Sequence, residues 1–304
     1  QIEAGQAQEA LGTLDQAQMV MPNSPLVYLY RAQAFLKLED TQQALENARR
    51  ANELDVTLLP AYRIIGEVMQ AEGDLAGSIA PLSTYVQFEK DDAQAWLSLA
   101  DAYLSIGDSK EALKALDRTL RLNNRREDAY LHRADIYLEL GSSEKALEDY
   151  QTAARLNPES YAASLGIGKA LMALDYPGDA WERFERTRSL AETDLQKAEL
   201  IFWRGQALEA LGSLEAAIRD YRTLVDLPRE QVKEEWVRFA EKRLSALITS
   251  TPTPRPKMPT PTPSATFTRQ PTRTLAPTAT RQPTRTATPT QTAAPTQTVT
   301  PTPK

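Results

Sequence analysis

The fold is decided by residues 95–158, AWLSLADAYLSIGDSKEALKALDRTLRLNNRREDAYLHRADIYLELGSSEKALEDYQTAARLNP, because one pattern of side chains occurs there twice. The first copy reads Trp96, Ala100, Tyr103, Gly107, Ala112, and 34 residues later the same places hold Tyr130, Ala134, Tyr137, Gly141, Ala146. A fixed period of this length is typical of stacked two-helix units, each packed only on its neighbours. The sequence therefore predicts a helical solenoid and not one globular core.

The same spacing continues on both sides of this stretch. Units begin at Pro25, Leu59, Ala93, Glu127 and Tyr161, and a sixth, displaced by three residues, begins near Ala198. The eighth and twentieth positions hold small residues, which let the two helices of a unit approach closely: Ala32, Gly66, Ala100, Ala134, Gly168, Gly205 and Ala44, Ser78, Ala112, Ala146, Ala180, Ala217. Residues 1–24 fit only the second helix of a further unit, which predicts a partial repeat before six repeats over 25–231.

This pattern resembles the tetratricopeptide repeat (TPR) family, whose signature is aromatic-x2-Leu-Gly/Ala-x2-Tyr, then Ala-x3-Phe, then Pro. The resemblance covers residues 1–231. It implies an all-α fold, an α-solenoid of stacked helix-turn-helix repeats that form a right-handed superhelix. The alternative, a plain bundle of amphipathic helices, predicts helical spacing but not the 34-residue register.

Four glycines stand where a first helix must end, which predicts a left-handed turn at each of them: Gly73, Gly107, Gly141, Gly212. Glu39 and Asp175 replace this glycine in two units. A side chain disfavours the left-handed conformation, so we expect those two turns to use another geometry.

Two further segments follow the repeats. Residues 232–248 predict a capping helix, and its apolar stripe is Val232, Trp236, Phe239, Ala240, Leu244, Leu247. The alternative for this segment is a helix that binds a partner. Residues 249–304 hold thirteen of the twenty prolines and no acidic residue, which predicts a disordered, basic Thr/Pro-rich tail that acts as a semi-rigid spacer. The tail is either an O-glycosylated stalk or an unmodified linker.

Composition argues against an enzyme. The chain has no cysteine and one histidine, His132, so thiol, metal and imidazole chemistry have almost no side chains to use, and we expect no cofactor and no bound metal. For His132 itself we expect a solvated or groove-lining position. The repeat region has a net charge of −13 against +7 in the tail, and such an acidic array is a poor partner for nucleic acid.

No apolar run is long enough to span a membrane. The tail and the absence of cysteine favour an extracytoplasmic or cell-envelope location, with the cytoplasm as the alternative. Gln1 lies inside a repeat, so we expect a fragment with further sequence upstream.

The resemblance also implies a binding site. In the family, first helices line a concave groove that receives partner peptides, through the second, fifth, ninth and twelfth positions of each unit. Carried over to this chain, the candidate groove residues are Leu29, Gln33, Arg63, Glu67, Leu97, Asp101, Leu131, Asp135, Leu138, Leu165, Lys169, Phe202. They suit a partner peptide with apolar and basic side chains. The alternative for the leucines is packing against the neighbouring helix.

The resulting hypothesis is a protein–protein interaction scaffold without catalysis of its own. The alternative is a regulatory or substrate-recruiting region of a larger enzyme whose catalytic domain lies upstream. The basic tail and the acidic residues Glu67, Asp101 and Asp135 also predict weak self-association that a partner peptide must displace; an inert spacer is the alternative.

Overall fold

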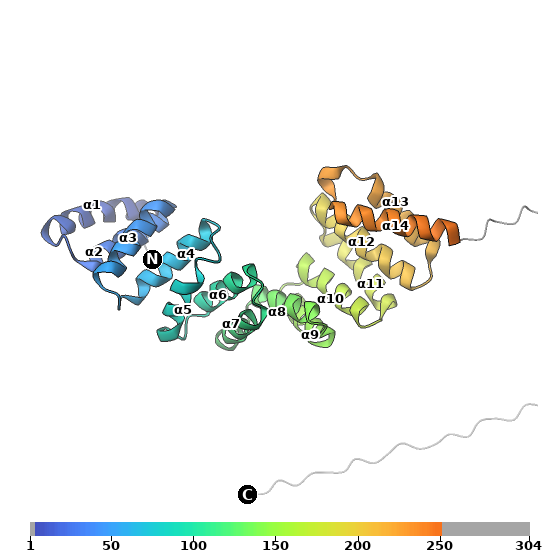
Figure 1. Cartoon of the computed structure of the whole chain (residues 1–304), viewed down its shortest axis with the longest axis horizontal. Helices are drawn as coiled ribbons and strands as arrows, with labels where there is room; N and C mark the ends of the chain where they lie inside the picture. The colour runs from blue at the N-terminus through green and yellow to red at the C-terminus, as the bar shows by residue number, and fades with distance from the viewer. Residues whose placement is uncertain (1–3, 251–304) are drawn as a thin grey trace, which may run out of the picture. The chain divides into compact units, whose positions relative to one another are not determined.

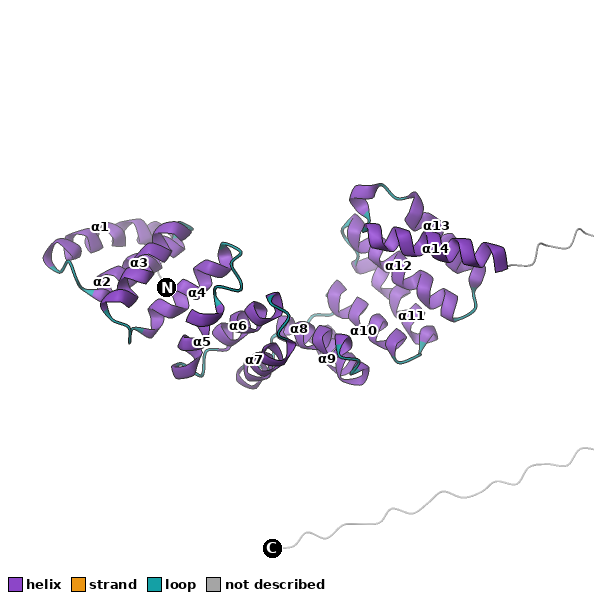
Figure 2. Ribbon diagram, in the orientation of Figure 1, coloured by secondary structure: helices purple, strands orange, loops and turns teal. Residues whose placement is uncertain are grey.

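The computed structural model describes residues 4–250, and helices are their only regular secondary structure besides turns (Figures 1 and 2). The described residues form fourteen α-helices: α1 (Ala4–Val20), α2 (Pro25–Lys37), α3 (Thr41–Leu54), α4 (Leu59–Ala71), α5 (Ile79–Phe88), α6 (Ala93–Ser105), α7 (Ser109–Leu122), α8 (Glu127–Glu139), α9 (Ser143–Leu156), α10 (Tyr161–Ala173), α11 (Pro177–Thr187), α12 (Asp194–Ala210), α13 (Leu214–Asp226) and α14 (Glu234–Ser250). Two short 3₁₀ helices, Arg188–Leu190 and Arg229–Gln231, follow α11 and α13.

The helices form a stack of antiparallel pairs, which confirms the solenoid. Each helix packs on its neighbours along the chain, and the first helices of successive units also touch, as α2 does with α4 and α8 with α10. The first helices α2, α4, α6, α8 and α10 begin at the predicted residues, 34 apart. A plain bundle of amphipathic helices would not require helix starts 34 residues apart.

The sixth unit begins earlier than predicted. Its first helix, α12, starts at Asp194 and not near Ala198. The cause is a capping box: Thr193 accepts a hydrogen bond from the backbone N–H of Gln196, and the Gln196 side chain accepts from the N–H of Thr193. These bonds satisfy free N–H groups at the helix start and add one turn before the repeat pattern resumes.

Small residues hold the two helices of each unit together, as the spacing predicts. The alanines at the eighth and twentieth positions are fully buried. Where the eighth residue is glycine, a large side chain of the second helix occupies the space: a Cβ added to Gly168 would lie 2.2 Å from Phe184, and one added to Gly66 would lie 2.5 Å from Leu82.

The turns between paired helices correct one expectation. The four predicted glycines have left-handed φ angles, and Glu39 (φ 60°) and Asp175 (φ 63°) adopt the same conformation and not a different one. The reason is the backbone hydrogen bonding that closes each helix. The N–H of Asp40 donates to Phe35 O (3.0 Å) in the Glu39 turn, as Ser142 N–H donates to Tyr137 O (2.7 Å) in the Gly141 turn.

The second helix of the second unit lacks its first turn. α5 begins at Ile79, whereas the other second helices of this register, α3, α7, α9 and α11, begin four residues earlier in their units. Residues 75–78 form turns instead, in which Asp74 Oδ1 accepts from Gly77 N–H (2.9 Å). Glycine and serine favour turns over helix interiors, which explains the late start.

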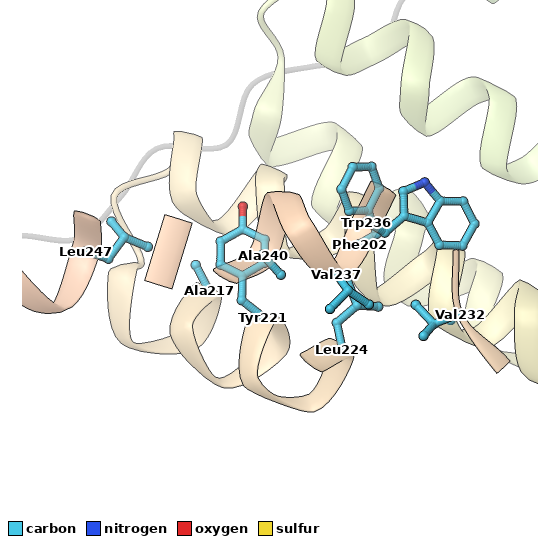
Figure 3. Packing of buried hydrophobic residues seen from close by; sticks show 10 residues of the cluster. Phe202, Ala217, Tyr221, Leu224, Val232, Trp236, Val237, Ala240 and Leu247 are labelled. Atoms are coloured by element: carbon cyan, nitrogen blue, oxygen red, sulfur yellow. The ribbon is translucent and has the colours of Figure 1, made fainter. Parts of the chain in front are cut away.

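The last helix covers the end of the stack. α14 lies on α12 and α13, and its Trp236, Val237 and Ala240 are buried together with Phe202 and Tyr221 (Figure 3). It begins two residues after the predicted start, so Val232 is buried just ahead of the helix, and it ends at Ser250, inside the predicted tail. The other predictions for the tail, its disorder and its role as a spacer, concern residues outside those that the structure describes.

Candidate functional site

The first helices of successive units are joined by side-chain hydrogen bonds along one side of the stack. Gln70 Nε2 of α4 donates to Ser98 O of α6 (2.6 Å), and Lys169 Nζ of α10 pairs with Glu199 Oε1 of α12 (2.7 Å). We call the side formed by the groove positions of α2, α4, α6, α8, α10 and α12 the first-helix face. Its candidate residues are therefore held on helices and not on mobile loops.

A hollow of about 620 Å³ opens on this face between α2 and α4. It brings together three of the candidate residues, Gln33, Arg63 and Glu67. Arg63 Nε lies 2.8 Å from Glu67 Oε1 and 3.5 Å from Asp92 Oδ2, so the arginine is oriented between two carboxylates. The remaining lining residues are Leu36, Lys37, Pro60, Ile64 and Tyr85.

The middle of the face is acidic, and its acids have partners within the chain. Asp101 Oδ1 of α6 lies 2.9 Å from Nδ1 of His132 on α8, and each side chain is about a third exposed. This hydrogen bond raises the pKa of His132 against the opposing effect of burial, and the nearby Asp135 and Asp128 add to the rise. Asp135 is exposed and accepts a hydrogen bond from the hydroxyl of Tyr150.

The candidate apolar residues divide into two groups. Leu29, Leu97, Leu165 and Phe202 are buried, with at most 9% of each residue exposed. They belong to the core, so for these four the packing alternative is correct and no partner reaches them without a rearrangement. Two leucines of α8 are half-buried and stay available at the surface: Leu131, Leu138.

The charge of Lys169 is also engaged by contacts within the chain. Its ammonium group pairs with Glu199 and lies 5.3 Å from the ring centre of Trp203. Both contacts compete with any partner carboxylate for this cation.

Sequence reasoning missed an arginine that bridges consecutive units. Arginine occupies the seventh position in three units, and each guanidinium bonds both the second helix of its own unit and that of the preceding one. In these three units the residue at the twenty-third position is Asn or Asp. The units with an apolar seventh residue have neither Asn nor Asp at that position. The three sets are Arg31 with Asn47 and Asp15, Arg133 with Asp149 and Asp117, Arg204 with Asp220 and Glu185. This pairing within the repeat was the signal that could have identified them.

The described residues 4–250 show neither a metal site nor a membrane-spanning helix. No group of three or more His, Asp or Glu side chains is arranged to hold a metal ion there. None of the helices in this range is long and apolar enough to cross a membrane.

Comparison with known proteins agrees with this geometry. Tetratricopeptide repeat sequence models match residues 93–136 and 198–231, and a TPR repeat model matches 134–175. The structure of the MamA protein is similar at 22% identity (TM-score 0.52; 55% of this chain and 91% of that one), as is YrrB, described as a TPR protein with an unusual peptide-binding site, at 17% (0.55; 58% and 91%). The C-terminal part of a TPR repeat-containing protein from Cytophaga hutchinsonii is similar at 14% (0.59; 76% and 93%). No curated protein sequence matches the chain.

Proposed function

We propose that this chain, in which tetratricopeptide repeat models match residues 93–175 and 198–231, is a protein-interaction scaffold that binds a peptide segment of a partner along its first-helix face. The observation that carries the proposal is the hollow between α2 and α4, where Gln33, Arg63 and Glu67 meet. The likeness to YrrB supports it, since that protein is described as having a peptide-binding site.

The side chains on α8 indicate which types of residue the partner segment carries. Leu131, Asp135 and Leu138 follow a four-residue and then a three-residue step, so they lie on one side of the helix. Two half-buried leucines flank an exposed carboxylate there. A segment that alternates apolar and basic side chains complements this arrangement.

The proposed role is binding without catalysis or a cofactor. The sequence supports this with its lack of cysteine and its single histidine, which is already paired with Asp101. Recognition by a preformed helical face needs no further chemistry.

The test is a titration with a labelled peptide that alternates leucine and lysine, compared with one in which serine replaces lysine. Asp135→Asn removes the exposed charge but keeps an acceptor for Tyr150, and Glu148→Gln, an exposed acid on α9, is the matched control. We expect Asp135→Asn to weaken binding of the basic peptide about fivefold, as expected for an exposed charge pair, and the control to have no effect. Equal binding of both peptides, or equal losses in both variants, would contradict the proposal.

A further inference from the structure

A second hollow, of about 380 Å³, lies between the second helices α5 and α7, and residues of α6 also line it. Its lining includes Val86 and Leu99, which are buried, and the half-buried rings of Trp96 and Tyr103. The Trp96 ring is held in place because its Nε1 donates to Lys90 O (3.0 Å). The hollow therefore has apolar and aromatic groups in its lining, beside polar and charged side chains such as Gln87 and Glu111.

A row of cations runs beside this hollow. Lys110, Lys114, Arg118 and Arg121 follow steps of four, four and three residues along α7, which places them on one face of the helix. The last three line the hollow. Arg118 is fixed by hydrogen bonds to Lys90 O (3.0 Å) and to the exposed Asp91 (3.0 Å). Lys110, Lys114 and Arg121 are exposed, and Lys114 pairs with Glu111, which also lines the hollow. Such a row stands out in a repeat region whose net charge is −13.

The residue at the seventh position of the unit contributes to the apolar character of this hollow. In the third unit it is Leu99, which makes no polar bridge. In the fourth unit it is Arg133, whose guanidinium bonds Asp117 of α7 and Asp149 of α9. The arginine places a charged group between those second helices, whereas the leucine places an apolar one between α5 and α7.

We propose that this hollow is a second binding site, which takes an apolar side chain of an acidic peptide segment from a partner protein. The apolar residue enters between Trp96 and Tyr103, and flanking carboxylates pair with Arg121 and, in competition with Glu111, with Lys114. An acidic peptide is favoured over nucleic acid because the surrounding array is strongly acidic, which repels a long polyanion more than a short acidic segment. The charge preference is opposite to that of the first-helix face, so the two sites select different segments.

Three synthetic probes test this site by fluorescence anisotropy on the full chain. The first is a fluorescein-labelled peptide of glutamates around a central phenylalanine, the second replaces that phenylalanine with serine, and the third is a labelled oligothymidine. Lys114→Gln/Arg121→Gln removes two cations at the edge, and Gln87→Trp fills the hollow from an exposed lining position. Arg155→Gln is the matched control, because Arg155 is exposed and holds in the fourth unit the position of Arg121 in the third.

We expect the phenylalanine peptide to bind, and both the double variant and Gln87→Trp to weaken that binding about tenfold or more. Arg155→Gln should bind like the unchanged chain, and circular dichroism melts should show that all variants fold. Equal binding of the serine peptide would overturn the role of the hollow, and a loss in the control as large as in the double variant would overturn the role of the cations. Tighter binding of oligothymidine through the same residues would overturn the assignment of a peptide.

Discussion

The guanidinium of Arg133 forms a two-point ion pair with the buried carboxylate of Asp149, with Nε to Oδ2 at 2.7 Å and Nη2 to Oδ1 at 2.8 Å. Its Nη1 donates to Asp117 of the preceding unit at 2.7 Å. One side chain thereby joins α8 to two second helices, α7 and α9. The contact between the third and fourth units is thus partly ionic and not only apolar.

Removing the buried acid should destabilise this junction. We expect Asp149→Ala to cost about 3 kcal/mol, because Arg133 keeps its charge but loses the better shielded of its two carboxylates. The loss should be local, since repeat units are stabilised mainly by their neighbours. Hydrogen exchange should therefore accelerate most in α7, α8 and α9, and little in α2.

A double variant separates the ion pair from general packing. Arg133→Leu/Asp149→Ala reproduces the pair found at the same positions of the third unit, Leu99 and Ala115. Replacing a buried ion pair by apolar residues is often close to neutral, so most of the lost stability should return. A double variant as unstable as Asp149→Ala would show that the charge pairing is not the cause.

The close approach of α10 and α11 depends on a missing side chain. We expect Gly168→Ala to destabilise the chain by about 1–3 kcal/mol, because its Cβ would lie 2.2 Å from the fully buried ring of Phe184. Gly168→Ala/Phe184→Leu, which copies Ala100 and Leu116 of the third unit, should recover part of this loss in urea unfolding. Gly12→Ala is the control: an added Cβ meets nothing within 4 Å in α1, so stability should be unchanged or slightly higher.

The turn after α2 holds a strained residue. We expect Glu39→Gly to stabilise the chain by about 0.5–1 kcal/mol, because Glu39 has a φ of 60° that glycine adopts without a Cβ clash. Glu72→Gly is the control, since Glu72 follows α4 with a right-handed φ of −82° and gains nothing from glycine. The melting temperatures of the two variants should move in opposite directions; a lower value for Glu39→Gly would contradict the strain.

The helices and their register could be predicted because the repeat supplies several independent copies of each position. The start of α12 and of α5 could not, since both depend on bonds made by residues outside the pattern, Thr193 with Gln196 and Asp74 with Gly77. The geometry of the Glu39 turn also escaped prediction. There, the backbone bonds that close the helix outweigh the preference of one residue.

The site was predicted less well than the fold. Position within the repeat indicates which side of a helix a residue faces, but not how far the next unit covers it: Leu97 is buried, whereas Leu131 is half-buried. A comparison of positions within single units also does not reveal hydrogen bonds between units. The bond from Arg133 to Asp117 of the preceding unit is an example.

The single histidine reports on the acidic middle of the first-helix face. The hydrogen bond with Asp101 raises the pKa of His132 above its ordinary value of 6.5, and the other charged groups around it, Asp135 and Asp128, act in the same direction. The folded chain therefore holds this proton more tightly than the unfolded chain. The resulting stability is fully present below about pH 6.5 and is lost as the pH rises through the raised pKa.

Proton NMR can follow this titration without assignment, because the chain has one histidine. We expect the midpoint of the imidazole resonance above 6.5, and a lower midpoint in Asp101→Asn, where the charged partner is gone and burial remains. The same midpoint in both chains would show that the contact with Asp101 does not control the proton.

The tail should compete with partners for the first-helix face. Residues 251–304 carry seven basic side chains and no acidic one, while the repeat region has a net charge of −13. Tethering gives such a segment an effective concentration of about millimolar at the array. A chain that ends at Ser250 should therefore bind the leucine–lysine peptide several-fold more tightly at low salt than the full chain does.

The salt dependence and a neutralised tail of the same length decide between competition and an inert spacer. The difference between the two chains should nearly vanish near 0.15 M salt, where the Debye length is about 8 Å. A full-length variant with glutamine at the seven basic tail positions keeps the length and the prolines, so it should behave like the shortened chain if charge is the cause. If the full, shortened and neutralised chains bind the peptide equally well at low salt, the tail does not occupy the first-helix face.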